Sequence, residues 1–207
     1  KGAQQYDLVG IVQEVSDTNW AKGALVNVAM PWLRTKYIAV WDADAFIPLR
    51  QIEAAYKQLE VDAADVVMPF NLAYMVRRTA LAMFRNGRVD FRRIANTLTV
   101  TTYNLEGNAY GYCVIIRTAL FKHVRGFSDI LRGWGWEDVE IKHRLLAVGA
   151  REAFLPGACF HINHPRPPTS RMQPLDASRN MYETGRVRDM AIPERLAYLG
   201  ITAVPGE

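Results

Sequence analysis

The chain has 207 residues, of which 50% are hydrophobic and 22% charged, and its formal net charge is +4. This composition is typical of a folded globular protein and excludes a disordered or fibrous one. A chain of this length buries roughly 70% of its unfolded surface on folding, so its core does not depend on disulfides or a structural metal. Asp, Arg or Pro interrupts every apolar run well before the ~18 residues of a membrane span. We therefore expect one domain over residues 1–207, with no membrane span and no export signal.

The cysteines bear on the cellular compartment of the protein, and the arginines bear on the charge of its surface. Cys113 and Cys159 stand among apolar neighbours, which is typical of small buried side chains and not of a disulfide framework. We therefore expect a reducing, cytoplasmic location. Six arginines with few acids between them lie from Arg77 to Arg93. We interpret this arginine cluster as a solvated helix face and loop, with a site for an anionic substrate as the alternative.

Strand-like and helix-like segments alternate along the chain. In order, the patterns predict a strand at Leu8–Val15, a helix at Trp20–Met30, a strand at Tyr37–Trp41, a helix opened by Pro48, a strand at Val66–Met68, a helix-compatible segment at Tyr74–Phe84, a strand at Thr97–Thr102, and helices at Thr118–Val124, Glu137–Val148 and Ser178–Arg188. Continuous apolar strands separated by helices predict the α/β class, with a mostly parallel central sheet flanked by helices. Ligands are then expected at the carboxyl ends of strands.

The sharpest local feature is Asp42-Ala43-Asp44, directly after the apolar strand Tyr37–Trp41. Two carboxylates there lie where α/β folds bind ligands, and carboxylate oxygens suit hard divalent ions such as Mg²⁺ or Mn²⁺. We predict one metal at Asp42 and Asp44. The alternative is a solvated turn between a strand and a loop.

A second feature is the glycine and tryptophan loop Gly133–Trp136, which runs into Glu137 and Asp138 at the start of a helix. Helix capping alone explains acids in a first turn, but it does not explain Trp134 and Trp136. An aromatic platform beside a carboxylate is a common way to hold a sugar ring during proton abstraction. We therefore predict a sugar site here, with core packing as the alternative.

The third feature is His161-Ile162-Asn163-His164-Pro165. Neutral imidazoles are common ligands for transition metals. Because Pro165 biases His164 toward an extended backbone, the two rings need a bend between them to converge on one ion. A single histidine joining the aspartate pair is easier to satisfy, and the alternative is one packed and one exposed histidine.

The order of these three motifs, with Trp20–Ala29 upstream, resembles GT-A fold glycosyltransferases. The likeness is to glycosyltransferase family 7, the β-1,4-galactosyltransferase type, and to bacterial capsule-type family 2 enzymes. It spans roughly residues 9–165 and implies the GT-A, nucleotide-diphospho-sugar transferase fold. It further implies a donor-binding part at residues 1–70, an acceptor and metal part at 100–165, and a C-terminal loop and helix at 166–207.

On the donor and metal side, the resemblance implies that Trp20 and Lys22 contact the donor nucleotide. It implies Asp44 as the direct metal ligand and Asp42 as a group nearer the nucleotide ribose, while Gly107 and Gly111 belong to a glycine-rich strand near the sugar.

On the acceptor side, the resemblance places Trp134 against the acceptor, Glu137 on a sugar hydroxyl and Asp138 as the catalytic base. It also makes His164 the inherited metal ligand and His161 a substitute for the family's methionine.

Three departures from the family pattern have consequences. Trp136 replaces a glycine, which should reshape the acceptor pocket, and Lys22 in place of arginine loses bidentate contacts. The family also begins with two further β-strands and a nucleotide-base contact before the equivalent of Leu8–Val15. We therefore expect a fragment or an unusually short variant that lacks the first strands.

Together the motifs predict a metal-dependent inverting glycosyltransferase that uses Mn²⁺ or Mg²⁺. It would move a hexose or N-acetylhexosamine from a UDP-sugar to a hydroxyl of a carbohydrate acceptor, in polysaccharide or capsule biosynthesis. The alternatives are a sugar nucleotidyltransferase, whose glycine-rich phosphate loop is not visible, and a carbohydrate- or nucleic-acid-binding module. The mild basic excess falls short of a nucleic-acid-binding footprint, so no nucleic acid is expected as a partner.

Overall fold

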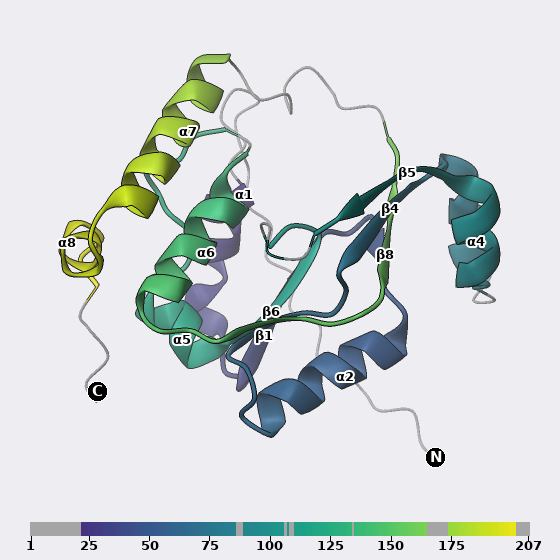
Figure 1. Cartoon of the computed structure of the whole chain (residues 1–207), viewed down its shortest axis with the longest axis horizontal. Coiled ribbons are helices and arrows are strands. Elements are labelled where there is room, and N and C mark those ends of the chain that lie inside the picture. Colours follow the sequence, from purple (N-terminus) through teal and green to yellow (C-terminus); the bar gives the residue numbers. More distant parts are fainter. Residues whose placement is uncertain are drawn as a thin grey trace.

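The strands of the chain form two four-stranded sheets. The computed structural model describes residues 22–85, 89–105, 107, 110–133, 135–164 and 174–201. The strands in these ranges are β1 (Tyr37–Trp41), β2 (Ala45–Phe46), β3 (Val66–Met68), β4 (Leu72–Val76), β5 (Thr99–Asn104), β6 (Cys113–Arg117), β7 (Glu152–Phe154) and β8 (Ala158–Ile162). The first sheet has the order β1-β6-β3-β7 and the second the order β2-β8-β4-β5. Figure 1 labels β1 and β6 of the first sheet and β4, β5 and β8 of the second.

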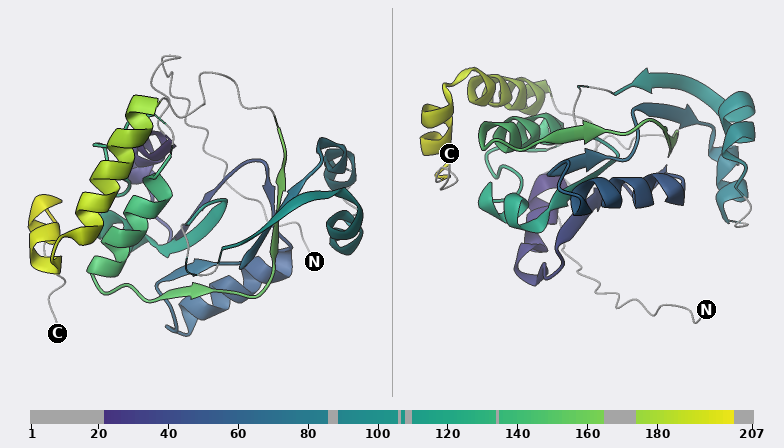
Figure 2. Two further views of the ribbon diagram at one scale, coloured as in Figure 1. Left: turned by 45° about the horizontal axis from the view of Figure 1, so that its top comes forward. Right: turned by 60° about the horizontal axis from the view of Figure 1, so that its bottom comes forward.

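Helices surround these sheets (Figures 1 and 2). The α-helices are α1 (Lys22–Val28), α2 (Leu49–Glu60), α3 (Leu81–Arg85), α4 (Phe91–Leu98), α5 (Thr118–His123), α6 (Glu137–Ala147), α7 (Pro174–Asp189) and α8 (Ile192–Tyr198), and two 3₁₀ turns lie at Met30–Trp32 and Arg78–Ala80. None of the helices in the described ranges is long and apolar enough to cross a membrane.

The α/β class is confirmed, but the mostly parallel sheet is not. In the first sheet β6 runs antiparallel to both β1 and β3, and only β3 and β7 pair in parallel. In the second, β4 and β8 are parallel, while β2 pairs antiparallel with β8 and β5 with β4. Antiparallel pairing does not need a helical crossover, so the alternation of helices and strands could not reveal the direction of β6.

The inner strands β3 and β6 of the first sheet are buried on both faces, which explains why they read as continuous apolar runs. In β3, Val66 and Met68 join one core with Ile141 and Leu145 of α6. The intervening Val67 joins another core with Leu59 of α2. Helices α6 and α2 therefore cover opposite faces of this sheet.

The second sheet has a core of its own, rich in aromatic rings. Tyr74 of β4 stacks on Phe160 of β8, and Phe91 of α4 packs against the same ring. Phe84 of α3 stacks on Phe46 of β2 with ring centroids 3.8 Å apart. Helices α3 and α4 therefore cover one face of the sheet in which β8 carries His161, while Asp44 directly precedes β2 and His164 follows β8.

Several predicted elements match the structure closely. Strands β1 and β3 occupy the predicted residues, and α1, α2, α5 and α6 lie where helices were predicted. Helix α6 gives way to Gly149, which has a φ of +80° and takes the left-handed backbone that ends many helices. The predicted strand Leu8–Val15 lies outside the described residues.

Other elements differ from the prediction. The first half of Tyr74–Phe84 is not helical: it is strand β4, held between β8 and β5. Helix α4 was not predicted, although Asp90 caps it by accepting a hydrogen bond from Arg93 N at 2.9 Å. At the C-terminal side, the predicted helix Ser178–Arg188 extends over Pro174–Asp189, and α8 follows it.

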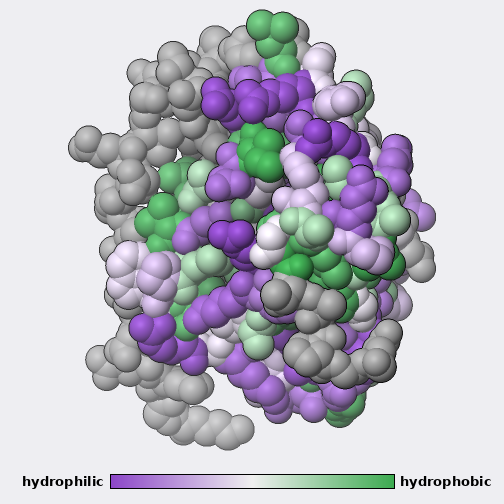
Figure 3. Space-filling model, turned by 90° about the vertical axis from the view of Figure 1, so that its left-hand side faces the viewer, coloured by the Kyte–Doolittle hydropathy of each residue, from purple (hydrophilic) through white to green (hydrophobic). Residues whose placement is uncertain are grey.

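The two cysteines are buried and free, as predicted, and burial raises the pKa of Cys113 to about 12. Of the arginine cluster, Arg77, Arg78, Arg92 and Arg93 have described side chains, and all four are exposed. This exposure agrees with a solvated helix face and loop. The face of the molecule that carries α7 and α8 mixes hydrophilic and hydrophobic residues (Figure 3).

Candidate active site

The carboxyl end of β1 is tied to β8 by the short strand β2. Antiparallel pairing of β2 with β8 places Ala45 opposite His161. Ile162 N then donates a hydrogen bond to Asp44 O at 3.1 Å. Strand pairing therefore brings the second aspartate of the Asp-x-Asp motif beside the histidines of the third motif.

Three predicted metal ligands converge here. Asp44 Oδ2 lies 3.2 Å from His161 Nε2 and 2.8 Å from His164 Nε2. One ligand atom from each residue lies within 4.8 Å of the others. Between the two histidines, Asn163 N donates to Val76 O at 2.8 Å, so β4 holds the segment that joins them. Both histidines can therefore face one ion.

The chemical state of this group suits a cation. A hydrogen bond from His161 holds the pKa of Asp44 below its ordinary value, so its side chain is a carboxylate at neutral pH. His161 is buried, and its Nδ1 has no hydrogen-bond partner among the described atoms. Its Nε2 is therefore the nitrogen directed at a shared ligand position.

Asp42 plays a different part from Asp44. Its Oδ1 pairs with Lys22 Nζ of α1, and its backbone N donates to Tyr112 O at 2.8 Å. It therefore does not join the three converging ligands. Lys22 and Asp42, both predicted to face the donor, are neighbours in the fold.

The predicted acids Glu137 and Asp138 occupy the first turn of α6, and both are half-buried. Val139 N donates to Asp138 Oδ1 at 2.9 Å. Burial raises the pKa of Asp138 above its ordinary value, while the charge of Lys22 opposes that rise. Burial and the charge of Asp138 also raise the pKa of Glu137. A raised carboxyl pKa is characteristic of acid–base sites.

The two predicted glycines both approach side chains of α6, the helix that begins with the acids. A Cβ on Gly111 would stand 3.2 Å from Asp138 Oδ2, so a larger residue there would require this carboxylate to move by a few tenths of an ångström. The carbonyl of Gly107 accepts a hydrogen bond from Lys142 Nζ of α6 at 2.7 Å. The glycine-rich segment is therefore fastened to the helix that carries Asp138.

Lys142 was not singled out from the sequence. It is buried, and its Nζ also lies 3.5 Å from Glu152 Oε2, which accepts a hydrogen bond from Tyr110 OH at 3.0 Å. A signal was available, since Lys142 follows Asp138 by four residues and so lies on the same helix face. It indicates that this face points into the protein.

The tryptophans are only partly described. Trp136 is half-buried, precedes α6 and has a left-handed backbone with φ of +74°. This is the position where the resemblance expected a glycine, the residue that adopts such a φ without strain. Trp20 and Trp134, predicted to contact donor and acceptor, lie outside the described residues.

The sequence matches two family models. Residues 5–125, more than half of the chain, match the glycosyl transferase family 2 model. The chain belongs to glycosyl transferase family 2. Residues 92–166 also match a second model, described as the N-terminal domain of galactosyltransferase. A comparison with curated protein sequences gave no match.

Solved structures agree with this assignment. The catalytic domain of Drosophila β1,4-galactosyltransferase 7, crystallised with xylobiose, aligns with a TM-score of 0.50 and 17% identity over 84% of this chain and 63% of that chain. S. aureus TarS in complex with UDP-GlcNAc aligns with a TM-score of 0.50 and 16% identity over 86% of this chain and 50% of that chain.

These likenesses confirm the predicted GT-A fold. The family matches place the chain among the glycosyltransferases, as predicted, and favour that class over a nucleotidyltransferase or a binding module without catalysis. The chain spans between half and two thirds of the length of these two solved structures.

Proposed function

We propose that the chain transfers a hexose or N-acetylhexosamine from a UDP-sugar to a sugar hydroxyl, with inversion at the anomeric carbon and with Mn²⁺ as the cofactor. One observation carries the proposal: Asp44, two residues after Asp42, belongs to a group of two histidines and one carboxylate, and the charges of both Lys22 and Asp42 act on the half-buried carboxylate of Asp138. A cation site and a base are the two parts that this reaction requires. In this proposal residues 1–207 act as one catalytic domain.

The donor set favours Mn²⁺ over Mg²⁺. Mg²⁺ prefers oxygen ligands, whereas the group of Asp44, His161 and His164 offers two imidazole nitrogens and one carboxylate oxygen. These residues fit a divalent ion that also accepts oxygen atoms from a diphosphate. When bound, the ion would neutralise the charge that develops on the departing nucleotide.

Lys22 and Asp42 would bind the remainder of the donor. Lys22 supplies a positive charge beside the carboxyl end of β1, and Asp42 offers a carboxylate oxygen to a ribose hydroxyl. We take UDP as the nucleotide because the structurally similar TarS binds UDP-GlcNAc in its crystal structure. Gly107 and Gly111 would leave space for the sugar.

Asp138 would act as the general base. Its carboxylate takes the proton of the acceptor hydroxyl as the oxygen attacks the anomeric carbon. The bond from that carbon to the diphosphate oxygen breaks, and UDP leaves with the bonding electrons. Attack opposite the leaving group inverts the anomeric configuration, and a positioned base contributes roughly 10²- to 10⁴-fold to such a step.

The acceptor would be a carbohydrate, as in polysaccharide or capsule biosynthesis. Glu137 has a buried oxygen, Oε2, without a hydrogen-bond partner among the described atoms, so it can accept a hydrogen bond from a sugar hydroxyl. Trp136 is adjacent and offers an aromatic face. We assign Trp134 the same role from its place in the motif.

A thermal-shift titration of UDP with Mn²⁺, Mg²⁺ or EDTA tests the donor site, because a ligand that binds only the folded protein raises the unfolding midpoint. We expect a rise that requires a metal and is larger with Mn²⁺. The same protein is then incubated with UDP-GlcNAc or UDP-galactose, and UDP release is measured. Equal shifts in Mn²⁺ and EDTA would contradict the metal assignment, and pyrophosphate release from UTP and a sugar 1-phosphate would instead support a nucleotidyltransferase.

A further inference from the structure

Helix α7 lies along α6, the helix that begins with the two acids (Figures 1 and 2). Its residues, Pro174–Asp189, fall beyond both segments that match the family models, which end at residues 125 and 166. A contact between α7 and the loop before these acids, which contains Arg132 and Gly135, is therefore an addition to the part of the chain that the models cover.

Asn180 of α7 makes such a contact. Its side chain is fully buried and hydrogen-bonds the loop three times. Arg132 N donates to Asn180 Oδ1 at 3.1 Å, and Asn180 Nδ2 donates to Arg132 O at 2.7 Å and to Gly135 O at 3.1 Å. Both amide hydrogens are used, so the loop backbone is fixed at two points.

The loop needs support of this kind. Gly133, Gly135 and Trp136 have φ values of +67°, +105° and +74°. Glycines adopt such values without strain, but a non-glycine residue such as Trp136 keeps one only where surrounding contacts determine it. Helix α7 also closes over Gly133, because a Cβ there would lie 3.1 Å from Asp176 Oδ2.

We propose that Asn180 is a positioning residue for the transfer reaction: it fixes the loop that delivers Trp136 to the acceptor and starts α6 where Asp138 reaches the acceptor hydroxyl. This inference rests on the role proposed above for Asp138. Gly135, the second anchored residue, is three positions before Asp138, so a shift at the anchor moves the helix start. A small displacement of a reacting group is enough to lower a rate 10²-fold.

The substitution Asn180→Asp isolates the hydrogen bonds from side-chain volume. Aspartate has nearly the same shape and still accepts from Arg132 N, but it loses both donations and sets a carboxylate against two carbonyl oxygens. Asn180→Ser is the second variant, because its smaller side chain leaves room for water to bridge the same backbone groups.

Gln51 provides the matched control. It is a buried amide that binds backbone in the same way: Nε2 donates to Pro69 O at 2.7 Å and to Ala158 O at 3.1 Å, and Oε1 accepts from Ala158 N at 3.3 Å. It joins α2 to the start of β8, and neither it nor its partners belong to the loop that contains Arg132 and Gly135. Gln51→Glu therefore makes an equivalent chemical change elsewhere.

Three measurements on the purified proteins separate positioning from general stability. These are UDP–Mn²⁺ affinity by calorimetry, kcat and KM for UDP release from UDP-GlcNAc or UDP-galactose, and hydrogen exchange of peptides covering residues 131–141. For Asn180→Asp we expect at least a tenfold fall in kcat, a UDP–Mn²⁺ affinity within about twofold of the parent, and faster exchange in that peptide. Gln51→Glu should lower Tm but leave kcat within about twofold and exchange at 131–141 unchanged.

An unchanged kcat in Asn180→Asp, or an equal fall in Gln51→Glu at the same loss of Tm, would overturn the inference. If Asn180→Asp does not fold, the same comparison is made with Asn180→Ser, for which a smaller fall in kcat is expected. If the parent binds no UDP–Mn²⁺ and releases no UDP, the proposed function fails and the positioning role fails with it. Hydrogen exchange still tests whether Asn180 holds the loop in place. Unchanged exchange at residues 131–141 in Asn180→Asp would overturn that structural role as well.

Discussion

Gly111 lies directly against the carboxylate of Asp138, so that a Cβ at Gly111 would stand 3.2 Å from Asp138 Oδ2. The next residue along, Tyr112, accepts a hydrogen bond from Asp42 N at 2.8 Å. Two consecutive residues before β6 thus connect the first turn of α6 with the carboxyl end of β1. The proposed base and the proposed donor contacts are held by one short piece of chain.

Replacing Asp138 by asparagine should lower kcat for sugar transfer by about 10²- to 10⁴-fold, because asparagine keeps the shape but cannot take the proton. UDP–Mn²⁺ affinity, measured by calorimetry, should stay near that of the parent because Asp138 is not among the converging metal ligands. Turnover equal to that of the parent would remove Asp138 from the role of base.

The same substitution should stabilise the fold at neutral pH. Burial raises the pKa of Asp138 in the folded protein above its ordinary value of 3.8, so the folded state is penalised once this side chain ionises. The penalty is absent well below pH 3.8, grows as the pH rises toward the folded-state pKa, and is complete above it. The Tm of Asp138→Asn minus that of the parent should therefore increase over this pH range, and a constant difference would contradict the burial effect.

Charge changes around Asp138 should move the acid limb of the pH–rate profile in opposite directions. The charge of Lys22 lowers the pKa of Asp138 and that of Asp42 raises it. The base acts when deprotonated, so kcat/KM is lost on acidification as Asp138 becomes protonated. The midpoint of this loss should lie at a higher pH in Lys22→Met, and at a lower pH in Asp42→Asn, than in the parent. Profiles of UDP release from about pH 4, close to the ordinary carboxyl pKa, up to about pH 9 test this. Shifts of one sign in both variants would argue against Asp138 as the titrating base.

Loss of one proposed metal ligand should remove the metal dependence of UDP binding. A ligand at about 100 times its Kd adds roughly 2.7 kcal/mol of stability, or about 5–10 °C in Tm for a domain of this size. This Mn²⁺-dependent increment should largely disappear in Asp44→Ala and His164→Ala.

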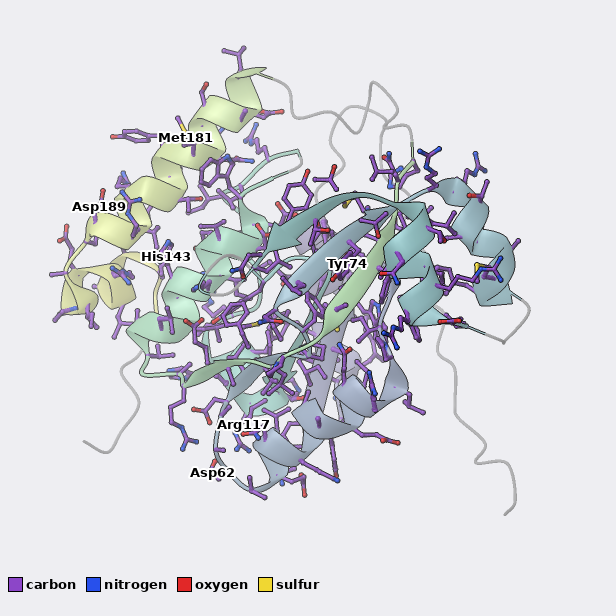
Figure 4. All side chains as sticks on the ribbon, turned by 45° about the vertical axis from the view of Figure 1, so that its right-hand side comes forward. Asp62, Tyr74, Arg117, His143, Met181 and Asp189 are labelled. Carbon is purple, nitrogen blue, oxygen red and sulfur yellow. The ribbon has the colours of Figure 1, made fainter. Side chains whose placement is uncertain are left out.

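The matched control for the metal ligands is Asp62→Ala. Asp62 pairs with Arg117, which lies opposite Tyr37 at the other end of β1 (Figure 4). This variant should keep the full UDP–Mn²⁺ increment. An increment that survives in both ligand variants would place the metal elsewhere.

At position 136, glycine should give a more stable protein than alanine, although alanine is the more stabilising of the two inside a helix. A left-handed backbone costs a non-glycine residue about 1–2 kcal/mol, and Trp136 has a φ of +74°. Trp136→Gly should therefore be more stable than Trp136→Ala by roughly 1 kcal/mol, or about 2–4 °C in Tm. Both variants should raise the KM for the acceptor and leave UDP affinity unchanged. A more stable alanine variant would mean that the loop rearranges instead of retaining this φ.

The elements that sequence patterns predicted well are those decided by nearby residues. The apolar runs of β1 and β3 end where acids or a turn begin, and α6 gives way to Gly149. Strand β4 was missed because its conformation depends on neighbours on both sides, β8 and β5, which lie far along the chain. Its own residues were compatible with a helix.

In the candidate site, too, the residue types could be predicted from the sequence, but the contacts between distant residues could not. The residue types of Asp44, His161 and His164 pointed to a metal, but their convergence depends on a two-residue strand, β2, that is too short to recognise in a sequence. Asn180 looked like an ordinary residue on a helix, because its partners are backbone atoms of Arg132 and Gly135. Side chains that bind backbone leave no partner residue type to search for.

The pairing of β2 with β8 also sets the time at which the site can exist. A chain is synthesised from its N-terminus, and early segments begin to fold before later ones emerge. Asp44 is made early, yet until Ala158–Ile162 has been made β2 lacks its partner strand and Asp44 lacks both imidazoles. While the residues between Asp44 and β8 are being synthesised, a nascent chain therefore carries the Asp-x-Asp motif without the complete set of ligands, and it gains that set only after β8 has joined the second sheet.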